Sequence, residues 1–246
     1  MTNQINGEKS QAGSLVAGTL VHTKEGLRPI EEIKVGDYVL SKPENGEGEQ
    51  AYKRVTRTYE FDDKEIWYIP FSVRENRFKG VPDLDGELFV TGDHPFWVAD
   101  VEYEHLKAHK NTWVKAEGLR DGMLLLLADG RLVSGGYGNK LICMQFSELA
   151  WFHVGNGNQP YEYGQVASFM SSTPQLCQGD IKNALGEIIL RTCNPNSPGD
   201  YFNEGEEWEG ISEVKWFKHK VYNLEVEDYH TYFVAKQGVW VNVHAH

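Results

Sequence analysis

Short apolar runs, each closed by a glycine, a proline or an acidic turn, fill the first hundred residues and constrain the fold more than any other feature. They extend over 15–22, 38–41, 51–60, 66–73, 88–91 and 96–99. Strands of this length at intervals of about 8–12 residues are typical of an all-β barrel or sandwich. No long stretch of helical periodicity interrupts them. The sequence therefore predicts an all-β fold.

Local signals subdivide these strands. Gly18 interrupts the first run, and a glycine inside a strand marks a bend or a close approach of the backbone. Residues 29–33 are predicted to form one short helical turn, and residues 35–37 a tight turn. The acidic stretch 62–64 is predicted to form a turn between two separate strands.

The C-terminal residues also alternate with the period of a strand. Residues 221–226 alternate in this way, and a turn is predicted at 236–238. The valines of 239–243 then alternate with polar and aromatic residues. If this last strand stays regular, His244 lies on the face of Trp240 and opposite the valines.

Segment 136–212 differs from the rest of the chain. It holds 3 Lys/Arg and 9 Asp/Glu, which gives −6, half of the net charge of −12. The three cysteines of the chain all lie in it, at Cys143, Cys177 and Cys193. Their odd number excludes a complete disulfide framework. We interpret the segment as an insertion of mixed character, with a short helix or strand over 180–190.

Charge and hydropathy exclude several classes of function. The balance of 24 − 36 charged residues gives −12 and argues against a nucleic-acid binder, which needs a surplus of Lys and Arg. The longest apolar run, 123–128, is too short to span a membrane. The N-terminal residues are polar and lack the apolar core of an export signal. A longer secreted or surface parent remains compatible with this sequence.

Single motifs carry little information here. Thr91 and His94 flank a Gly-Asp turn, and alone they indicate a structural turn. His105 and His109 are spaced for one helical face, but the metalloprotease helix needs Glu where Leu106 stands, so a solvated face is favoured. The sequence contains no nucleophile elbow, no phosphate-binding loop and no CxxC pair. A zinc site on scattered histidines stays open.

The order of several motifs along the chain is more specific. This set resembles the Hint superfamily of hedgehog and intein proteins, and it is most similar to bacterial intein-like and polymorphic-toxin Hint domains. The blocks are Ser14–Val21, Ile33–Asp37, Thr91–Pro95, Trp113–Gly122, Val221–Val234 and Val243–His244.

The resemblance implies a pseudo-twofold, horseshoe-like β fold that brings its two ends together. The implied Hint domain covers 14–135 and 213–245, and 136–212 is an insertion of unknown role. Residues 1–13 are then a flanking leader, and His246 is a downstream flanking residue.

The resemblance also implies roles for individual residues. Ser14 would attack the carbonyl of Gly13, which has no side chain to hinder the approach. Thr91 would polarise the same bond, and His94 would protonate its nitrogen as a general acid. His230 would assist the downstream step.

At the other end, His244 matches the penultimate histidine, which polarises the C-terminal amide before a terminal Asn cyclises. Here that Asn position holds Ala245, the nucleophile position holds Ser14 where relatives usually have Cys, and Asn223 stands where an Asp is frequent. These departures indicate an engineered, inactive precursor. If His246 is native, the parent is expected to cleave rather than ligate, because His cannot accept the acyl group.

The expected function is self-catalysed cleavage or splicing in the active form, a single-turnover process rather than enzyme turnover, with no cofactor and no metal. Its partners would be the flanking segments of the same chain, with a C-terminal toxin module as a candidate, and the expected state is a monomer without nucleic-acid or membrane partners. Two alternatives stay open. One is an inert Hint-like scaffold that binds a protein through its acidic insertion. The other is a calcium-binding protein that uses 204–209, which lacks EF-hand spacing.

Overall fold

The chain folds almost entirely into antiparallel strands. The computed structural model describes residues 13–72, 85–144, 147–153, 164–177, 181–182, 188–190 and 215–244. In these ranges the helices are three short 3-10 turns, η1 (Ile30–Glu32), η3 (Glu104–His109) and η4 (Ala116–Gly118). The predicted all-β class is confirmed, and so is the predicted helical turn at 29–33.

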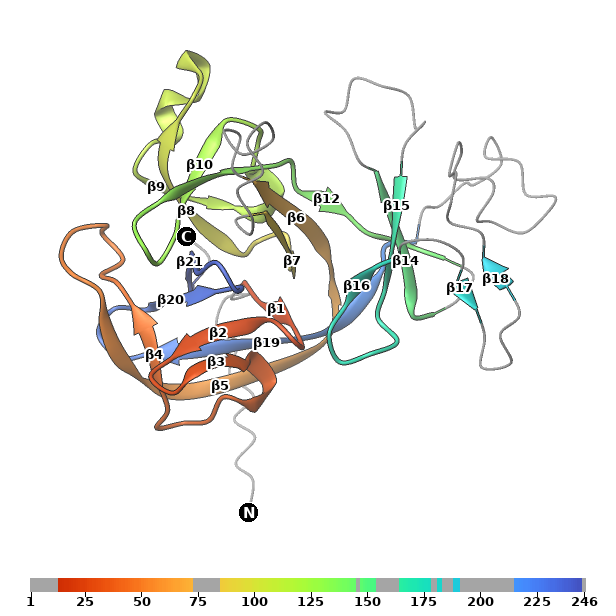
Figure 1. Cartoon of the computed structure of the whole chain (residues 1–246), viewed down its shortest axis with the longest axis horizontal. Helices are drawn as coiled ribbons and strands as arrows, with labels where there is room; N and C mark the ends of the chain where they lie inside the picture. Colours follow the sequence, from red (N-terminus) through yellow and green to blue (C-terminus); the bar gives the residue numbers. More distant parts are fainter. Residues whose placement is uncertain are drawn as a thin grey trace.

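One large sheet contains most of the described strands (Figure 1). Its order is β10-β11-β6-β7-β1-β19-β5-β4-β2-β20-β21-β8-β9, with β3 beside β2 and β12 beside β6. Since β10 also pairs with β8, the path returns on itself and forms a ring of strands. The bounds are β1 (Leu15–Val16), β2 (Leu20–Thr23), β3 (Gly26–Pro29), β4 (Tyr38–Ser41), β5 (Ala51–Glu65), β6 (Trp67–Ser72), β7 (Gly86–Val90), β8 (Pro95–Val101), β9 (Thr112–Lys115), β10 (Met123–Leu126), β11 (Leu132–Gly135), β12 (Asn139–Lys140), β19 (Lys218–Val226), β20 (Thr231–Val234) and β21 (Val239–Asn242).

The longest pairing joins β5 to β19, which run side by side along one side of the large sheet (Figure 1). The prediction that the acidic stretch 62–64 ends a strand is wrong, because β5 continues through it to Glu65. The pairing register shifts between His219 and Val221, and Asp63 adopts a positive φ of 55°. An irregularity in a paired strand absorbs the turn-forming residues without breaking the ladder.

The start of the chain bends as predicted. Gly18 has a φ of 77°, which a residue with a side chain rarely adopts, and it separates β1 from β2. The bend lets β1 pair with β19 and β7, whereas β2 pairs with β3, β4 and β20. The two strands on either side of Gly18 therefore enter the large sheet at two different positions.

The last strand departs from the predicted alternation. All four residues of β21 are buried, so neither face of it meets solvent. The strand pairs with β20 on one side and meets β8 at Val241 and Phe96 on the other. It ends at Asn242, and the exposed His244 lies in a bend beyond it, so His244 does not continue the face of Trp240.

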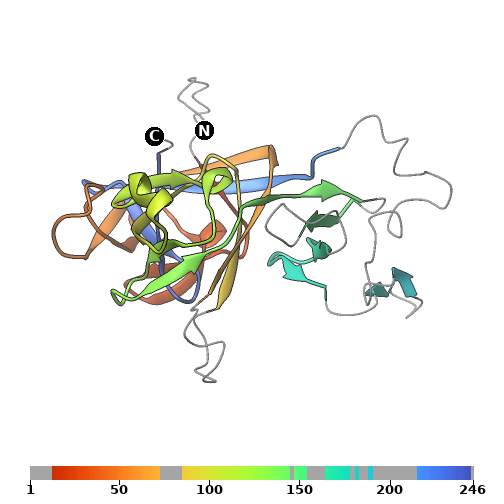
Figure 2. The same cartoon turned by 90° about the horizontal axis from the view of Figure 1, so that it is seen from above.

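The middle segment forms separate small sheets, which lie to one side of the large sheet (Figure 2). They contain β13 (Ile142–Cys143), β14 (Leu149–His153), β15 (Gly164–Ser168), β16 (Gln175–Leu176), β17 (Ile181–Lys182) and β18 (Ile188–Leu190). The region predicted as a helix or a strand over 180–190 thus contains two short strands. Cys193 and the acidic stretch 204–209 lie outside the described residues, as does the leader before Gly13.

A shared apolar cluster joins the small sheet to the large one. Phe152 and Phe169, from the middle segment, pack in one cluster with Val16 of β1, Phe89 of β7 and Val221 of β19. Phe152 stacks on Tyr68 at 4.2 Å between ring centroids, and Phe169 meets the edge of Phe89 at 5.3 Å. The segment that the sequence marked as an insertion therefore contributes to the core behind β1.

His105 and His109 lie on η3 and are exposed, with Leu106 turned inward, as the solvated-face interpretation predicts. A 3-10 helix has three residues per turn, so a spacing of four does not align the two rings. Within the described ranges no three His, Cys, Asp or Glu side chains gather as metal ligands would. No helix in those ranges is both long and apolar enough to cross a bilayer.

We expect Phe152→Ala to lower the free energy of unfolding by about 3–5 kcal/mol, because it removes a fully buried ring from the shared cluster. Urea unfolding followed by tryptophan fluorescence measures the change. Tyr52→Ala is the matched control, since Tyr52 is 46% exposed, and it should cost less than about 1 kcal/mol. Equal effects of the two substitutions would contradict a common core.

Candidate active site

The N-terminal strand delivers Ser14 to the end of β7. The Ser14 N–H donates to Thr91 Oγ1 at 2.9 Å, and the Thr91 N–H donates to the Ser14 carbonyl at 2.9 Å. Both residues are buried. The register Leu15↔Val90 continues by one residue to this pair, so ordinary strand pairing holds the backbone around Ser14.

The residue before Ser14 lies directly against His94. A β-carbon built on Gly13 would be 2.3 Å from His94 Cα, 2.8 Å from its backbone nitrogen and 2.9 Å from its Nδ1. Two of these contacts are with backbone, which cannot rotate away. The position before Ser14 therefore accepts glycine without displacing the turn that carries His94, as the sequence suggested on steric grounds.

The His94 side chain is fully buried. Neither of its ring nitrogens makes a hydrogen bond of normal geometry to any residue that the structure describes. Burial lowers the pKa of His94 to about 4, and the facing Gly13 backbone and the charge of Asp93 offset only part of that penalty. At neutral pH the ring is therefore neutral, with one nitrogen able to donate a proton and the other able to accept one.

The turn that holds His94 is fixed by backbone contacts. The His94 N–H donates to the Thr91 carbonyl at 3.1 Å, and the His94 carbonyl accepts from the Ala116 N–H at 2.8 Å. Phe96 packs edge-on against the imidazole at 5.5 Å. Thr91 and His94 are thus close because one turn holds both. The Ala116 N–H of η4 fixes that turn by its hydrogen bond to the His94 carbonyl.

Asn223 connects the two ends of the domain. Its Nδ2 donates to the Val243 carbonyl at 2.9 Å, and its Oδ1 accepts from the Tyr232 hydroxyl at 3.0 Å and from the Leu224 N–H at 2.7 Å. The register of β1 with β19, Leu15↔Tyr222, continues by one residue to Ser14 and Asn223. An ionised Asp has no proton to donate, so the amide makes a contact that a carboxylate could not make.

The pairing of the last strand, β21, with β8 also brings the C-terminal residues toward the turn that carries His94. β21 pairs with β8 at Val241 and Phe96, each of which is two residues from Val243 or His94. The backbone just before the chain end thus runs toward the turn that touches Gly13. The structure brings Gly13, Ser14, Thr91, His94 and Val243 to one place.

His230 and His244 lie side by side next to this point. Their ring centroids are 5.5 Å apart, and the His230 carbonyl accepts from the Val243 N–H at 2.9 Å. His230 has a positive φ of 53°, and its buried Nδ1 has no hydrogen-bond partner in the described part of the chain. His244 is exposed, and its backbone N–H donates to the side-chain Oδ1 of Asn242 at 2.9 Å.

Two predicted site residues, Ala245 and His246, lie outside the described residues. Sequence reasoning missed Tyr232, which is fully buried and orients Asn223, and it treated Asn223 only as a departure from a family pattern. A signal for both was present, because a polar residue in an otherwise apolar strand needs a partner when it is buried.

We expect a proton titration of His94 by NMR to give a pKa of about 4, against 6.5 for a free imidazole. Because the folded-state pKa is lowered, protons bind the unfolded chain more readily, and this contribution to stability is lost as the pH falls from about 6.5 to about 4. Each pH unit in that window costs up to about 1.4 kcal/mol.

The difference in unfolding free energy between the parent and His94→Gln should therefore shrink as the pH falls from 7 to 4.5. Urea unfolding at both pH values measures it. A constant difference would show that His94 is not shielded from protonation.

Comparison with known proteins shows which family and which folds this chain is similar to. Residues 20–135 match the family model described as "Pretoxin HINT domain", a stretch that includes Thr91 and His94. An iron-sulfur cluster assembly SufBD family protein of Mycobacterium tuberculosis is 25% identical over 176 residues, which cover 59% of this chain and 17% of that protein. A counterpart in Mycobacterium bovis matches equally. The chain thus spans about a sixth of the length of these curated relatives.

Solved structures similar to this chain include a bacterial intein-like domain from Clostridium thermocellum, with 23% identity, a TM-score of 0.48 and coverage of 93% of this chain and 97% of that one. Another is the gp41-1 intein, with 13% identity, a TM-score of 0.45 and coverage of 94% and 99%. Residues 20–135 are thus similar to Hint domains of the pretoxin type, and the Hint fold belongs to a family of autoprocessing domains.

Proposed function

We propose that the active form of this chain rearranges its own peptide backbone at the two ends of its Hint domain. The observation that carries the proposal is the burial of the Gly13–Ser14 peptide between Thr91 and His94, with the last strand, β21, paired to β8 two residues beyond His94. A self-processing domain needs its nucleophile and both scissile bonds in one place, because proximity supplies much of the rate. The proposed Hint domain is 14–135 with 213–245.

In the N-terminal step, Ser14 Oγ attacks the carbonyl carbon of Gly13. The bond from that carbon to the Ser14 nitrogen breaks, an ester replaces the amide, and the hydroxyl proton ends on the released amine. A neutral His94 suits this transfer, since one ring nitrogen accepts a proton while the other donates one. Thr91 Oγ1 already accepts the N–H of the scissile peptide and holds it in position.

In the C-terminal step, a side-chain amide at position 245 attacks its own backbone carbonyl and releases the downstream segment. His244 and His230, paired beside Val243, are the groups proposed to polarise that carbonyl and to protonate the leaving amine. Asn223 supports the step by holding the carbonyl two residues earlier. Ala245 has only a methyl group, so this step cannot occur in the present sequence.

We infer that the chain is a silenced precursor. A serine hydroxyl is a weaker nucleophile than a thiol near neutral pH, and Ala245 removes the second nucleophile. The flanking segments are then the substrates, and the pretoxin match supports a toxin module downstream as the partner. The proposed process needs no cofactor or metal ion, since every proton and nucleophile comes from the chain.

Ser14→Cys should restore the N-terminal step, because a thiol ionises far more readily than a hydroxyl. We expect added thiol to release residues 1–13 through the thioester, with mass spectrometry showing a break after Gly13. The variant is made with Cys143, Cys177 and Cys193 replaced by Ser, so that no other thiol reacts.

In that background His94→Ala should slow release about 100-fold or more, the usual contribution of a positioned general acid. His105→Ala, on the exposed face of η3, is the matched control and should leave the rate within about twofold. An unchanged rate in His94→Ala would remove His94 from the mechanism. A folded Ser14→Cys chain that stays one intact band on a gel would favour the inert binding scaffold.

Ala245→Asn should restore the C-terminal step in a fusion that carries a reporter protein after His246. We expect slow cleavage after position 245, with the N-terminal product lighter by one water than simple hydrolysis gives, because cyclisation forms a succinimide. The cleavage should depend on His244 and be independent of Ser14→Ala. A folded fusion that remains intact for days would contradict position 245 as the domain end.

A further inference from the structure

His230 has a strained backbone. Its φ of 53° lies in the left-handed region, which a residue with a side chain rarely adopts, and Asp228 two residues earlier has a φ of 63°. Such conformations cost free energy and persist only where surrounding contacts impose them. His230 is also one of the two histidines that lie side by side near the chain end. The contacts that impose its backbone conformation therefore also place its ring.

The residue that follows His230 is held by a buried network of hydroxyls. Ser41, the last residue of β4, donates from Oγ to the Thr231 carbonyl at 2.6 Å. Thr231 Oγ1 donates to the Lys42 carbonyl and accepts the Lys42 N–H at 3.3 Å. Ser41 and Thr231 are both fully buried. The network therefore ties the start of β20 to the end of β4, which is 190 residues earlier in the chain.

Both hydroxyls of this network use their hydrogen. Each hydroxyl carries one hydrogen, and the two hydrogens go to the carbonyls of Thr231 and Lys42. The two hydroxyl oxygens themselves are 3.1 Å apart. A buried polar network that is satisfied in this way favours one geometry, because a displacement leaves a polar group without its partner.

The same pair of strands carries the second histidine. Thr231 pairs with Asn242 across β20 and β21, and Asn242 Oδ1 accepts the His244 N–H at 2.9 Å. The Val243 N–H donates to the His230 carbonyl at 2.9 Å. A displacement of Thr231 would therefore change how the two rings lie, whose centroids are 5.5 Å apart.

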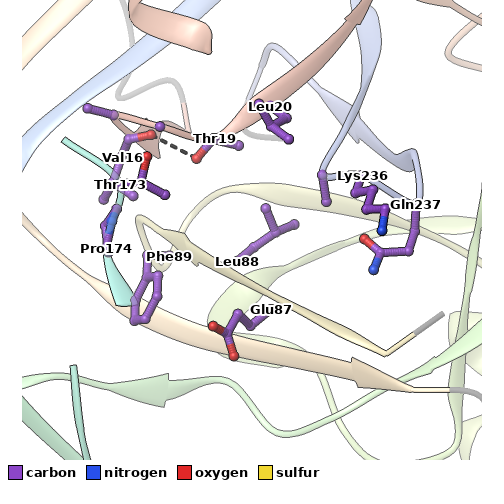
Figure 3. A pocket seen from close by; sticks show the side chains of 13 residues that line it. Val16, Thr19, Leu20, Glu87, Leu88, Phe89, Thr173, Pro174, Lys236 and Gln237 are labelled. Carbon is purple, nitrogen blue, oxygen red and sulfur yellow. Dashed lines mark hydrogen bonds between the residues drawn. The ribbon is translucent and has the colours of Figure 1, made fainter. Parts of the chain in front are cut away.

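The other end of this hairpin lies beside a cavity. The turn between β20 and β21 borders a hollow of about 240 Å³, with β7 on another side of it (Figure 3). Lys236 and Gln237 line it from the turn, and Glu87 and Leu88 line it from β7. The buried hydroxyl network lies at the opposite end of the hairpin, where the histidines are.

We propose that Ser41 and Thr231 are positioning residues for the C-terminal step, because they hold His230 in its strained conformation beside His244. Their hydroxyls act through the backbone that carries His230. The inference rests on the proposed C-terminal step. A displacement of about 1 Å in a catalytic group can slow a reaction about 100-fold, so the placement of this ring matters for the rate.

The rate test uses the Ala245→Asn fusion with its reporter. Thr231→Val removes the hydroxyl and keeps the shape of the side chain, and it should slow cleavage after position 245 about tenfold or more. Thr231→Ser keeps a hydroxyl and should stay within about threefold of the parent. Ser41→Ala should act like Thr231→Val, and the double variant should be little slower than either, because both remove the same tie.

Thr56→Val is the matched control for the loss of a threonine hydroxyl. Thr56 is exposed on β5, and its Oγ1 also donates to a backbone carbonyl, that of Glu225, at 3.2 Å. The substitution therefore removes the same kind of hydrogen bond away from His230. It should change the cleavage rate less than about twofold.

A second readout separates positioning from general damage to the fold. With Ser14→Cys in the cysteine-free background, thiol-induced release after Gly13 reports on the N-terminal site. We expect Thr231→Val to leave this release within about twofold. Equal slowing at both ends would overturn the proposal, because it would show a damaged fold rather than displaced histidines. An unchanged C-terminal rate in Thr231→Val would overturn it as well.

An NMR measurement tests the positioning even if the fusion does not cleave. In the present sequence the rings of His230 and His244 should give a mutual NOE, which should be lost in Thr231→Val and kept in Thr231→Ser and Thr56→Val. An NOE retained in Thr231→Val would overturn the proposal. A fusion that stays intact, with an NOE that depends on Thr231, would refute the C-terminal step alone and support Thr231 as a residue that holds His230.

Discussion

Everything near the candidate site depends on how a two-residue strand pairs. β1 pairs with β19 at both of its residues but with β7 at Val90 alone, and it closes the ring of strands between them. The hydrogen bonds of Ser14 with Thr91 extend that single pair. The first described residues of the chain are thus held by the same contacts that complete the sheet.

The core behind β1 comes partly from the middle segment. Phe152 and Phe169 complete the apolar cluster that Val16 and Val221 begin, and Thr173 lies against Gly18, where a β-carbon would meet its Oγ1 at 2.5 Å. A segment with a different composition can therefore be structurally necessary. Its aromatic residues supply apolar contacts that a shorter chain would have to find elsewhere.

Much of the fold follows from local patterns, because turns and strand alternation are short-range. The bend at Gly18, the helical turn at Ile30–Glu32 and the exposed face of η3 were all predictable in this way. The failure at 62–64 has a long-range cause, since a partner strand 160 residues away in the sequence holds β5 extended. The burial of both faces of β21 is also a long-range effect, because it depends on where β8 and β20 pack.

The site was predictable as a set of residues but not as a set of contacts. The order of motifs predicted Ser14, Thr91 and His94 as site residues. The structure places these three residues close together. The order of motifs could not indicate that His94 would be buried with both ring nitrogens unpartnered by the described residues, or that Asn223 would hold the carbonyl of Val243. Such contacts depend on the register of strand pairing. A shift of one residue would turn every side chain of a strand to the opposite face of the sheet.

The amide of Asn223 has a consequence for how the two ends of the domain respond to acid. A carboxylic acid in that position would donate to the Val243 carbonyl only while protonated, and the tie would come and go with pH. An amide has no proton to lose in the range where proteins are folded, so this tie persists under acidic and neutral conditions alike. The closure of the chain ends is thereby uncoupled from acidity.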